Sequence, residues 1–198
     1  MKHILAITVL LFLFYNSQGQ KTYVDSLRMH REKYIADLYQ VIKSDTAYIT
    51  FYPADESMII GAKVEVLAGE RPFNLMTSSG KTKEAKKYAK LTFTLAGKEY
   101  SLYAYQLLKL KERETTATLL FIPFTDETCG GTSYGGGRYI DLDTRDIRDS
   151  RIIIDFNKAY NPYCAFTTGY NCPVPPKENT LPVAVKAGEQ YQAGRFIH

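Results

Sequence analysis

The pattern of apolar and polar residues changes from a helical to an alternating period near residue 46. Between residues 22 and 42, apolar side chains recur with the spacing of one helix face, at Leu27, Tyr34, Leu38, Val41 and Ile42. Thr22, with Asp25 three residues later, fits a capping box at the start of this helix. We therefore expect one N-terminal helix whose apolar face packs on a sheet.

After residue 46 the chain is dominated by short segments with alternating or continuous apolar residues, typical of strands. They cover residues 47–51, 62–66, 91–95, 100–104, 118–122, 139–142 and 151–155. Ala96-Gly97 marks a hairpin turn between the third and fourth of these. Because few helices separate the strands, the sequence predicts a mainly β protein. We expect a single-domain antiparallel β-sandwich or barrel with the N-terminal helix packed on it.

A cluster of five lysines between Lys81 and Lys90 interrupts this pattern. It lacks the arginines and interleaved aromatic residues of a nucleic-acid site, so the sequence favours a solvated helix face there. The formal net charge of the chain is only +4. We expect no nucleic acid among the partners.

The first residues are typical of a secretory signal peptide. Lys2 and His3 precede an apolar run from Ile4 to Tyr15, which is too short for a membrane span. Small residues at Ser17 and Gly19 suit cleavage after Gly19. We expect a signal peptide over residues 1–19 and one β-rich domain over residues 20–198. The protein would be exported, periplasmic or secreted, with no stable membrane span after cleavage.

Several segments of the second half resemble the signature of domain-of-unknown-function family 1684. They are Phe124-Thr-Asp126, Tyr134-Gly-Gly-Gly-Arg-Tyr139, Asp155-Phe-Asn-Lys-Ala-Tyr-Asn-Pro-Tyr-Cys164, Cys172-Pro-Val-Pro-Pro-Lys-Glu-Asn179 and Ala187-Gly-Glu189. The resemblance covers most of the mature chain. It implies no activity, since this family has no established biochemical function.

The spacing of the cysteines favours a disulfide. Cys164 and Cys172 are eight positions apart, and an exported protein readily closes such a loop. Cys129 then remains as a buried or free thiol. Two alternatives stay open: inert thiols, or Cys164 as a nucleophile, for which the mature chain offers only His30 and His198 as histidine bases.

No metal or cofactor is expected. The chain has no Cys-x-x-Cys or His-x-x-x-His pair, and the two histidines of the mature chain do not furnish the usual zinc set. Asp141, Asp143, Asp146 and Asp149 lack the glycine and distal Glu of a calcium loop, which favours solvated turn residues.

The candidate ligand-binding residues gather between residues 134 and 161: Tyr134, Arg138, Asp155, Asn157, Tyr160 and Asn161. Three glycines, at 135 to 137, allow close backbone approach, and Arg138 offers a planar two-pronged donor for an anion. The alternative is structural. Asp155 would then pair with Arg138 inside the barrel, while Asn157 and Asn161 would hold turns.

Three functions follow from these residues, of which the first is favoured. The protein binds a small polar or anionic ligand in a pocket formed by residues 134–161. Alternatively, it is a hydrolase-type enzyme with Asp155 or Glu178 as general base and Arg138 stabilising charge. In the third case it is a structural or interaction protein whose loop region is fixed by the disulfide.

Overall fold

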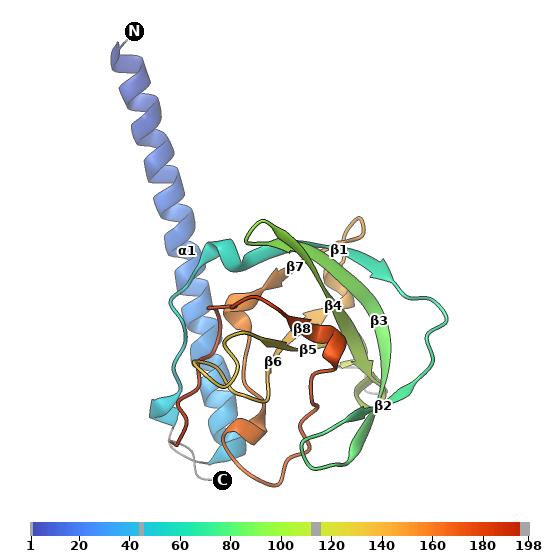
Figure 1. Ribbon diagram of the computed structural model, residues 1–198. Helices are drawn as coiled ribbons and strands as arrows, with labels where there is room; N and C mark the ends of the chain where they lie inside the picture. The colour runs from blue at the N-terminus through green and yellow to red at the C-terminus, as the bar shows by residue number, and fades with distance from the viewer. Residues whose placement is uncertain (1, 44–45, 112–115, 195–198) are drawn as a thin grey trace.

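The computed structural model describes residues 2–43, 46–111 and 116–194, with side chains from residue 22 onward except those of residues 110 and 111. His198 and the side chains of the predicted signal segment lie outside the described residues. Helix α1 (Lys2–Ile42) begins at Lys2 instead of at Thr22, because the helix continues without a break through the apolar run (Figure 1). None of the helices in the described part of the chain combines the length and apolar content that a membrane crossing requires.

The body of the protein is a curled antiparallel sheet that forms a half-barrel beside α1 (Figure 1). Its strands are β1 (Ile59–Val66), β2 (Phe73–Met76), β3 (Thr82–Leu95), β4 (Lys98–Leu107), β5 (Leu119–Asp126), β6 (Arg138–Asp143), β7 (Arg151–Asp155) and β8 (Thr180–Leu181). The described strands run in the order β6-β5-β4-β3-β1-β7, with β2 paired to β3 and the short β8 parallel to β5. The prediction of a mainly β fold with one N-terminal helix is confirmed.

Short helical segments connect and follow the strands. They are η1 (Thr46–Tyr48), η2 (Glu56–Met58), α2 (Leu108–Lys111), η4 (Thr144–Asp146), η5 (Phe156–Lys158), η6 (Tyr163–Ala165) and η7 (Lys177–Asn179). Three of them lie in the Pro-rich and Asn-rich part after β7, which has no long strand among its described residues. This part of the chain lies across the sheet and carries three of the six predicted ligand-binding residues, Asn157, Tyr160 and Asn161.

Alternation along β5 and β6 assigns their side chains to two different clusters. Leu120, Ile122 and Ile140 belong to the main core, which also contains residues of β1, β3, β4 and β7. Phe121 and Tyr139, one position away, belong to a second cluster on the opposite face. Because successive strand residues point to opposite faces, the other odd-numbered positions of β6 also face this second side of the sheet.

Local signals identify the β3–β4 hairpin correctly. Leu95 pairs with Lys98, so Ala96 and Gly97 form a two-residue turn, and both have positive φ angles of 49° and 77°. This is the conformation of a type I′ turn, which matches the twist of the two strands.

Two segments differ from their predictions. Residues 47–51 form η1 and an isolated bridge from Phe51 to Glu189 instead of a strand. The lysine cluster, predicted as a helix, belongs to β3. There, hydrogen bonding to β2 on one side and β4 on the other outweighs the helix preference of its Lys, Glu and Ala residues.

Helix α1 packs on the segment after β7 instead of on a sheet. Leu38 and Ile42 share a cluster with Ile49, with Ala165 of η6 and with Phe166, which follows η6. The helix also contacts η5. The helix thus covers the side of the half-barrel where β6 and β7 end the sheet.

Candidate functional site

Arg138 is fully buried, and both of its terminal nitrogens are hydrogen-bonded, whereas its Nε has no partner among the described residues. Its Nη2 lies 2.8 Å from Asp126 Oδ2 and 2.8 Å from the Val185 carbonyl oxygen, and its Nη1 donates to the carbonyls of Ala187 and Glu189. Both members of the Arg138–Asp126 ion pair have no exposed side-chain surface. The prediction that Arg138 pairs with Asp155 is therefore wrong. Its carboxylate partner is Asp126, on β5. Arg138 fixes the C-terminal segment to the sheet and does not offer its guanidinium to a ligand.

Asp155 and Asn157 form a hydrogen-bonded corner at the end of β7. Asp155 Oδ1 accepts from the Asn157 backbone N–H and from the Tyr23 hydroxyl of α1. Asn157 Oδ1 accepts from the Asp55 backbone N–H at 2.9 Å, and its Nδ2 donates to the Asp55 carbonyl at 2.7 Å. Lys158 Nζ lies 3.6 Å from the Asp155 carboxylate. Asn157 thus bonds both backbone groups of a distant residue, whereas the structural alternative expected it to hold a turn.

Asn161 belongs to a second buried network, which the sequence did not reveal. Its backbone N–H donates to Glu189 Oε2 at 2.7 Å, and the Tyr34 hydroxyl of α1 donates to the same oxygen at 2.8 Å. Glu189 is fully buried, and its Oε1 is among the buried atoms without a partner in the described structure, together with Asn161 Oδ1. Burial raises the pKa of Glu189 to about 8, so the carboxyl is neutral at pH 7.

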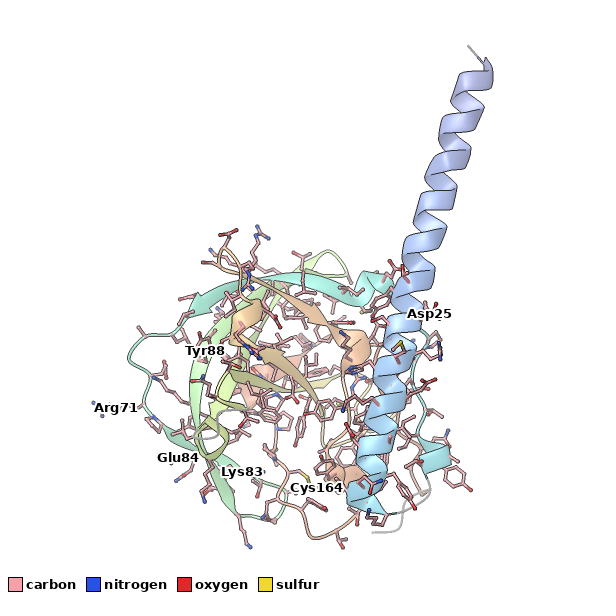
Figure 2. The ribbon with its side chains drawn as sticks, turned by 180° about the vertical axis from the view of Figure 1, so that it is seen from behind. Asp25, Arg71, Lys83, Glu84, Tyr88 and Cys164 are labelled. Atoms are coloured by element: carbon pink, nitrogen blue, oxygen red, sulfur yellow. A yellow bond between two sulfur atoms is a disulfide. The ribbon has the colours of Figure 1, made fainter. Side chains whose placement is uncertain are left out.

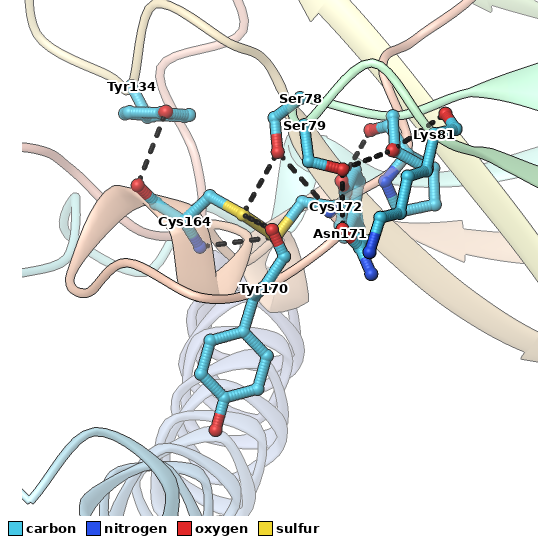
Figure 3. The surroundings of a disulfide bond; sticks show 11 residues. Ser78, Ser79, Lys81, Tyr134, Cys164, Tyr170, Asn171 and Cys172 are labelled. Carbon is cyan, nitrogen blue, oxygen red and sulfur yellow. Dashed lines mark hydrogen bonds between the residues drawn. A yellow bond between two sulfur atoms is a disulfide. The ribbon is translucent and has the colours of Figure 1, made fainter.

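Tyr134 lies beside the disulfide loop. Its hydroxyl donates to the Cys164 carbonyl at 3.4 Å (Figure 3). Its ring packs edge-on against Tyr191. The disulfide between Cys164 and Cys172 is confirmed, with Cα atoms 6.2 Å apart. Figure 3 also shows Ser78, whose hydroxyl lies 3.2 Å from Cys164 Sγ and so connects the loop to the end of β2. Since both sulfurs are bonded, Cys164 is not a free nucleophile.

Of the predicted residues, Tyr160 lies at a cavity of about 420 Å³ that we call the aromatic cavity. It lies between the second face of β5 and β6 and the covering segment, residues 160–173. Aromatic rings form much of its wall: Phe121, Tyr139, Tyr160, Tyr163 and Tyr170. The alternation in β5 and β6 explains this lining, because Phe121 and Tyr139 point away from the main core. Leu119 and Asp141 share that face and also line the cavity.

Asp141 is the acidic group of the aromatic cavity. Its Oδ2 accepts a hydrogen bond of 2.8 Å from the hydroxyl of Tyr160. The residue is exposed to the cavity although protein surrounds it on several sides. The lost hydration raises the pKa of its carboxyl, and the bond from Tyr160 opposes this rise. A carboxylate with these properties in a cavity is typical of functional sites.

Two further cavities meet the aromatic cavity at Asp141. One, of about 430 Å³, lies against α1 and shares Tyr160 and Tyr163 with it. The other, of about 680 Å³, lies where the edges of β6 and β7 fail to close the barrel, and Asp155 contributes to its wall. Asp141 lines all three.

The residues for a hydrolase do not converge. Glu178, the second candidate base, pairs with Lys87 at 2.9 Å and accepts from the Tyr105 hydroxyl at 3.3 Å. Arg138 is bound to Asp126. Among the described residues, no group of three or more His, Cys, Asp or Glu side chains is arranged to hold a metal ion.

The sequence reasoning missed Asp141, Lys83 and Glu189. Asp141 was interpreted as a solvated turn residue, although the alternation of Tyr139, Ile140, Asp141 and Leu142 places it inside a strand. An acidic residue that shares a strand face with a buried tyrosine is the signal that could have identified it. Lys83 had a comparable signal, because it shares a face of β3 with the buried Ala85.

Comparison with known proteins identifies relatives but no activity. The family described as "Protein of unknown function (DUF1684)" matches residues 45–190, which include the aromatic cavity and both disulfide cysteines. The solution NMR structure of an uncharacterized protein from Haloarcula marismortui has a similar fold, with a TM-score of 0.69. Its sequence is 30% identical, and the match covers 91% of this chain and 98% of that one. No curated protein matches the chain.

Proposed function

The chain belongs to the DUF1684 family of proteins of unknown function, and on that premise we propose that it binds a small polar ligand in the aromatic cavity. The observation that carries this proposal is the Asp141 carboxylate. One of its oxygens is held by Tyr160, and the residue is exposed at the point where three cavities meet.

The shape and lining of the cavity support binding. A volume of about 420 Å³ lies in the range of small-molecule sites, which combine apolar walls with a few polar groups that fix orientation. The rings and Pro162 supply the walls, and Asp141, Lys83 and Asn171 supply polar groups. This proposal keeps Tyr160 from the predicted set. It assigns Arg138, Asp155, Asn157 and Asn161 to the scaffold, since each is held by hydrogen bonds within the protein, although Arg138 Nε and Asn161 Oδ1 have no partner among the described residues.

A thermal-unfolding screen of the protein against a panel of small polar metabolites tests this proposal. A ligand of the native state at 100 times its dissociation constant adds about 2.7 kcal/mol of stability. We expect the shift to disappear in Asp141→Asn, which keeps an acceptor for the Tyr160 hydroxyl, and to persist in Glu84→Gln, an exposed control on β3. A shift that is equal in both variants would place the ligand elsewhere. The absence of any shift would contradict the proposal.

We also propose that the protein is exported, with a signal peptide cleaved near Gly19. The apolar run from Ile4 to Tyr15 supports this, and the Cys164–Cys172 disulfide is typical of oxidising compartments. The mass and N-terminal sequence of the protein recovered outside the cytoplasm test it. A chain that still starts at Met1 there, or that stays in the cytoplasm, would contradict export with cleavage.

A further inference from the structure

We propose that the aromatic cavity selects zwitterions, small molecules that carry both an ammonium and a carboxylate group, through Asp141 at one place and Lys83 at another. This inference rests on the proposed binding function and specifies its ligand class.

The first supporting observation is the position of Lys83. It lies on β3, two residues from the buried Ala85. Its partner on the neighbouring strand β2 is the buried Leu75. Its side chain lines the aromatic cavity, and burial lowers the pKa of its ammonium group. Figure 2 shows Lys83 on the sheet, at the same end of the domain as Cys164 of the covering segment. Lys83 remains exposed to solvent, so only part of its side chain loses hydration at the cavity.

The second observation is that neither charge of the cavity is neutralised. Lys83 and Asp141 form no ion pair with any residue that the structure describes. Their charged atoms are therefore more than 4.0 Å from each other. Both residues are exposed, so their charges are accessible to a ligand in the cavity. Lys87, another lysine of β3, is paired in contrast: its Nζ lies 2.9 Å from Glu178 Oε1.

The third observation is that aromatic rings line the same cavity as the two charges. Tyrosine rings attract cations through their faces, and they also cover the apolar body of a ligand. Tyr163 and Tyr170 pack against each other with ring centroids 5.2 Å apart and are partly exposed at the cavity. A ligand with an ammonium near Asp141 and these rings, and with a carboxylate near Lys83, satisfies both unpaired charges at once. A singly charged ligand leaves one of them unsatisfied.

Two matched sets of compounds test the inference by calorimetric titration of the purified protein. The first is phenylalanine, phenethylamine and 3-phenylpropionate, and the second is 6-aminohexanoate, hexylamine and hexanoate. Within a set the body is similar and only the charged groups differ, while the two sets differ in the separation of the charges. Because a hydrogen bond to a charged group contributes about 1.5 kcal/mol or more, we expect the zwitterion of at least one set to bind ~10-fold tighter than both singly charged relatives.

Two variants assign the charges. Asp141→Asn should abolish the advantage of the zwitterion over the carboxylate compound, and Lys83→Met should abolish its advantage over the amine. The exposed controls Glu84→Gln and Lys63→Met should keep the preference. The inference is overturned if the singly charged compounds bind as tightly as the zwitterion in both sets, and such binding would leave the proposed cavity function intact. If no compound in either set binds, this inference fails. The metabolite screen then decides separately whether the cavity binds any ligand.

Discussion

Replacement of Glu189 by glutamine tests whether a buried neutral carboxyl controls the pH dependence of stability. Glu189 is fully buried, and its Oε2 accepts hydrogen bonds from Tyr34 and from the backbone of Asn161. Burial raises its pKa from the ordinary 4.5 to about 8. The native state therefore holds this proton more tightly than the unfolded chain does.

The direction of the effect follows from this difference in proton affinity. Between pH 4.5 and 8 the folded protein carries the proton and the unfolded chain does not, so stability falls as the pH rises. The contribution of Glu189 to the free energy of unfolding is present in full below pH 4.5 and is lost as the pH approaches 8. Each tenfold change in proton affinity corresponds to 1.36 kcal/mol, so Glu189 alone accounts for a loss of ~5 kcal/mol across this interval.

Glutamine keeps the shape and the acceptor oxygen but does not titrate. Its amide also supplies donors in place of the oxygen that has no partner, Glu189 Oε1. Urea unfolding of the wild type and of Glu189→Gln at intervals between pH 4 and 9 measures the effect. We expect the difference in the free energy of unfolding to change steadily with pH in favour of the variant.

A matched control removes other groups from the comparison. Glu127→Gln changes an exposed carboxylate and should reproduce the wild-type slope. Asp141, whose pKa is also raised, contributes equally to all three proteins and disappears from the difference. Parallel curves for the wild type and Glu189→Gln would refute the reasoning, because they would mean that Glu189 is ionised in the native state at neutral pH.

Three further predictions concern the ion pair, the disulfide and the cavity. Arg138→Met leaves its carboxylate partner buried without a charge partner and should cost about 3–5 kcal/mol in urea unfolding; a cost below 1 kcal/mol would contradict the buried pair. Replacing Cys164 and Cys172 by serine should cost about 2.5 kcal/mol and weaken ligand binding, because the loop forms a wall of the cavity. An unchanged affinity for the ligand would contradict this, because the loop would then keep its position at the cavity without the disulfide. Tyr160→Phe should raise the pKa of Asp141 further, because the lost Tyr160 hydroxyl opposes the effect of lost hydration. NMR titration of the Asp141 carboxyl carbon measures this pKa, and a lower value in the variant would contradict the prediction.

The strands that could be predicted are those whose local pattern suffices. In the β3–β4 hairpin the alternation around Leu91 and Leu102 and the turn at Ala96 and Gly97 all agree. The lysine-rich beginning of β3 could not be predicted, because its strand conformation depends on pairing with β2 and β4. Residues 47–51 show the reverse case, an alternating segment that finds no complete strand partner among the described residues.

The site was harder to predict because its two sides are far apart in the sequence. The alternation in β6 indicates that Tyr139 and Asp141 share one face, but not that residues 160–173 cover it. That covering segment has no periodic pattern, and its position depends on the disulfide and on bonds to Ser78. For Arg138, the sequence correctly suggested a buried pairing as one alternative. The choice of Asp126 over Asp155 is decided by the antiparallel pairing of β5 and β6, which brings Phe124 beside Arg138.

The hydrogen bonds of α1 also have a consequence for how the protein folds. Tyr34 and Glu189 are 155 positions apart, and Tyr23 and Asp155 are 132 positions apart. Such distant contacts form late and slowly, because a long stretch of chain must be ordered before they contribute. The helix can pack early against Ile49 and Phe51, but these two hydrogen bonds form only when the distant segments are in place. Release of residues 185–191 from the sheet would break the Tyr34–Glu189 bond, and hydrogen exchange should show that α1 loses protection when this segment opens.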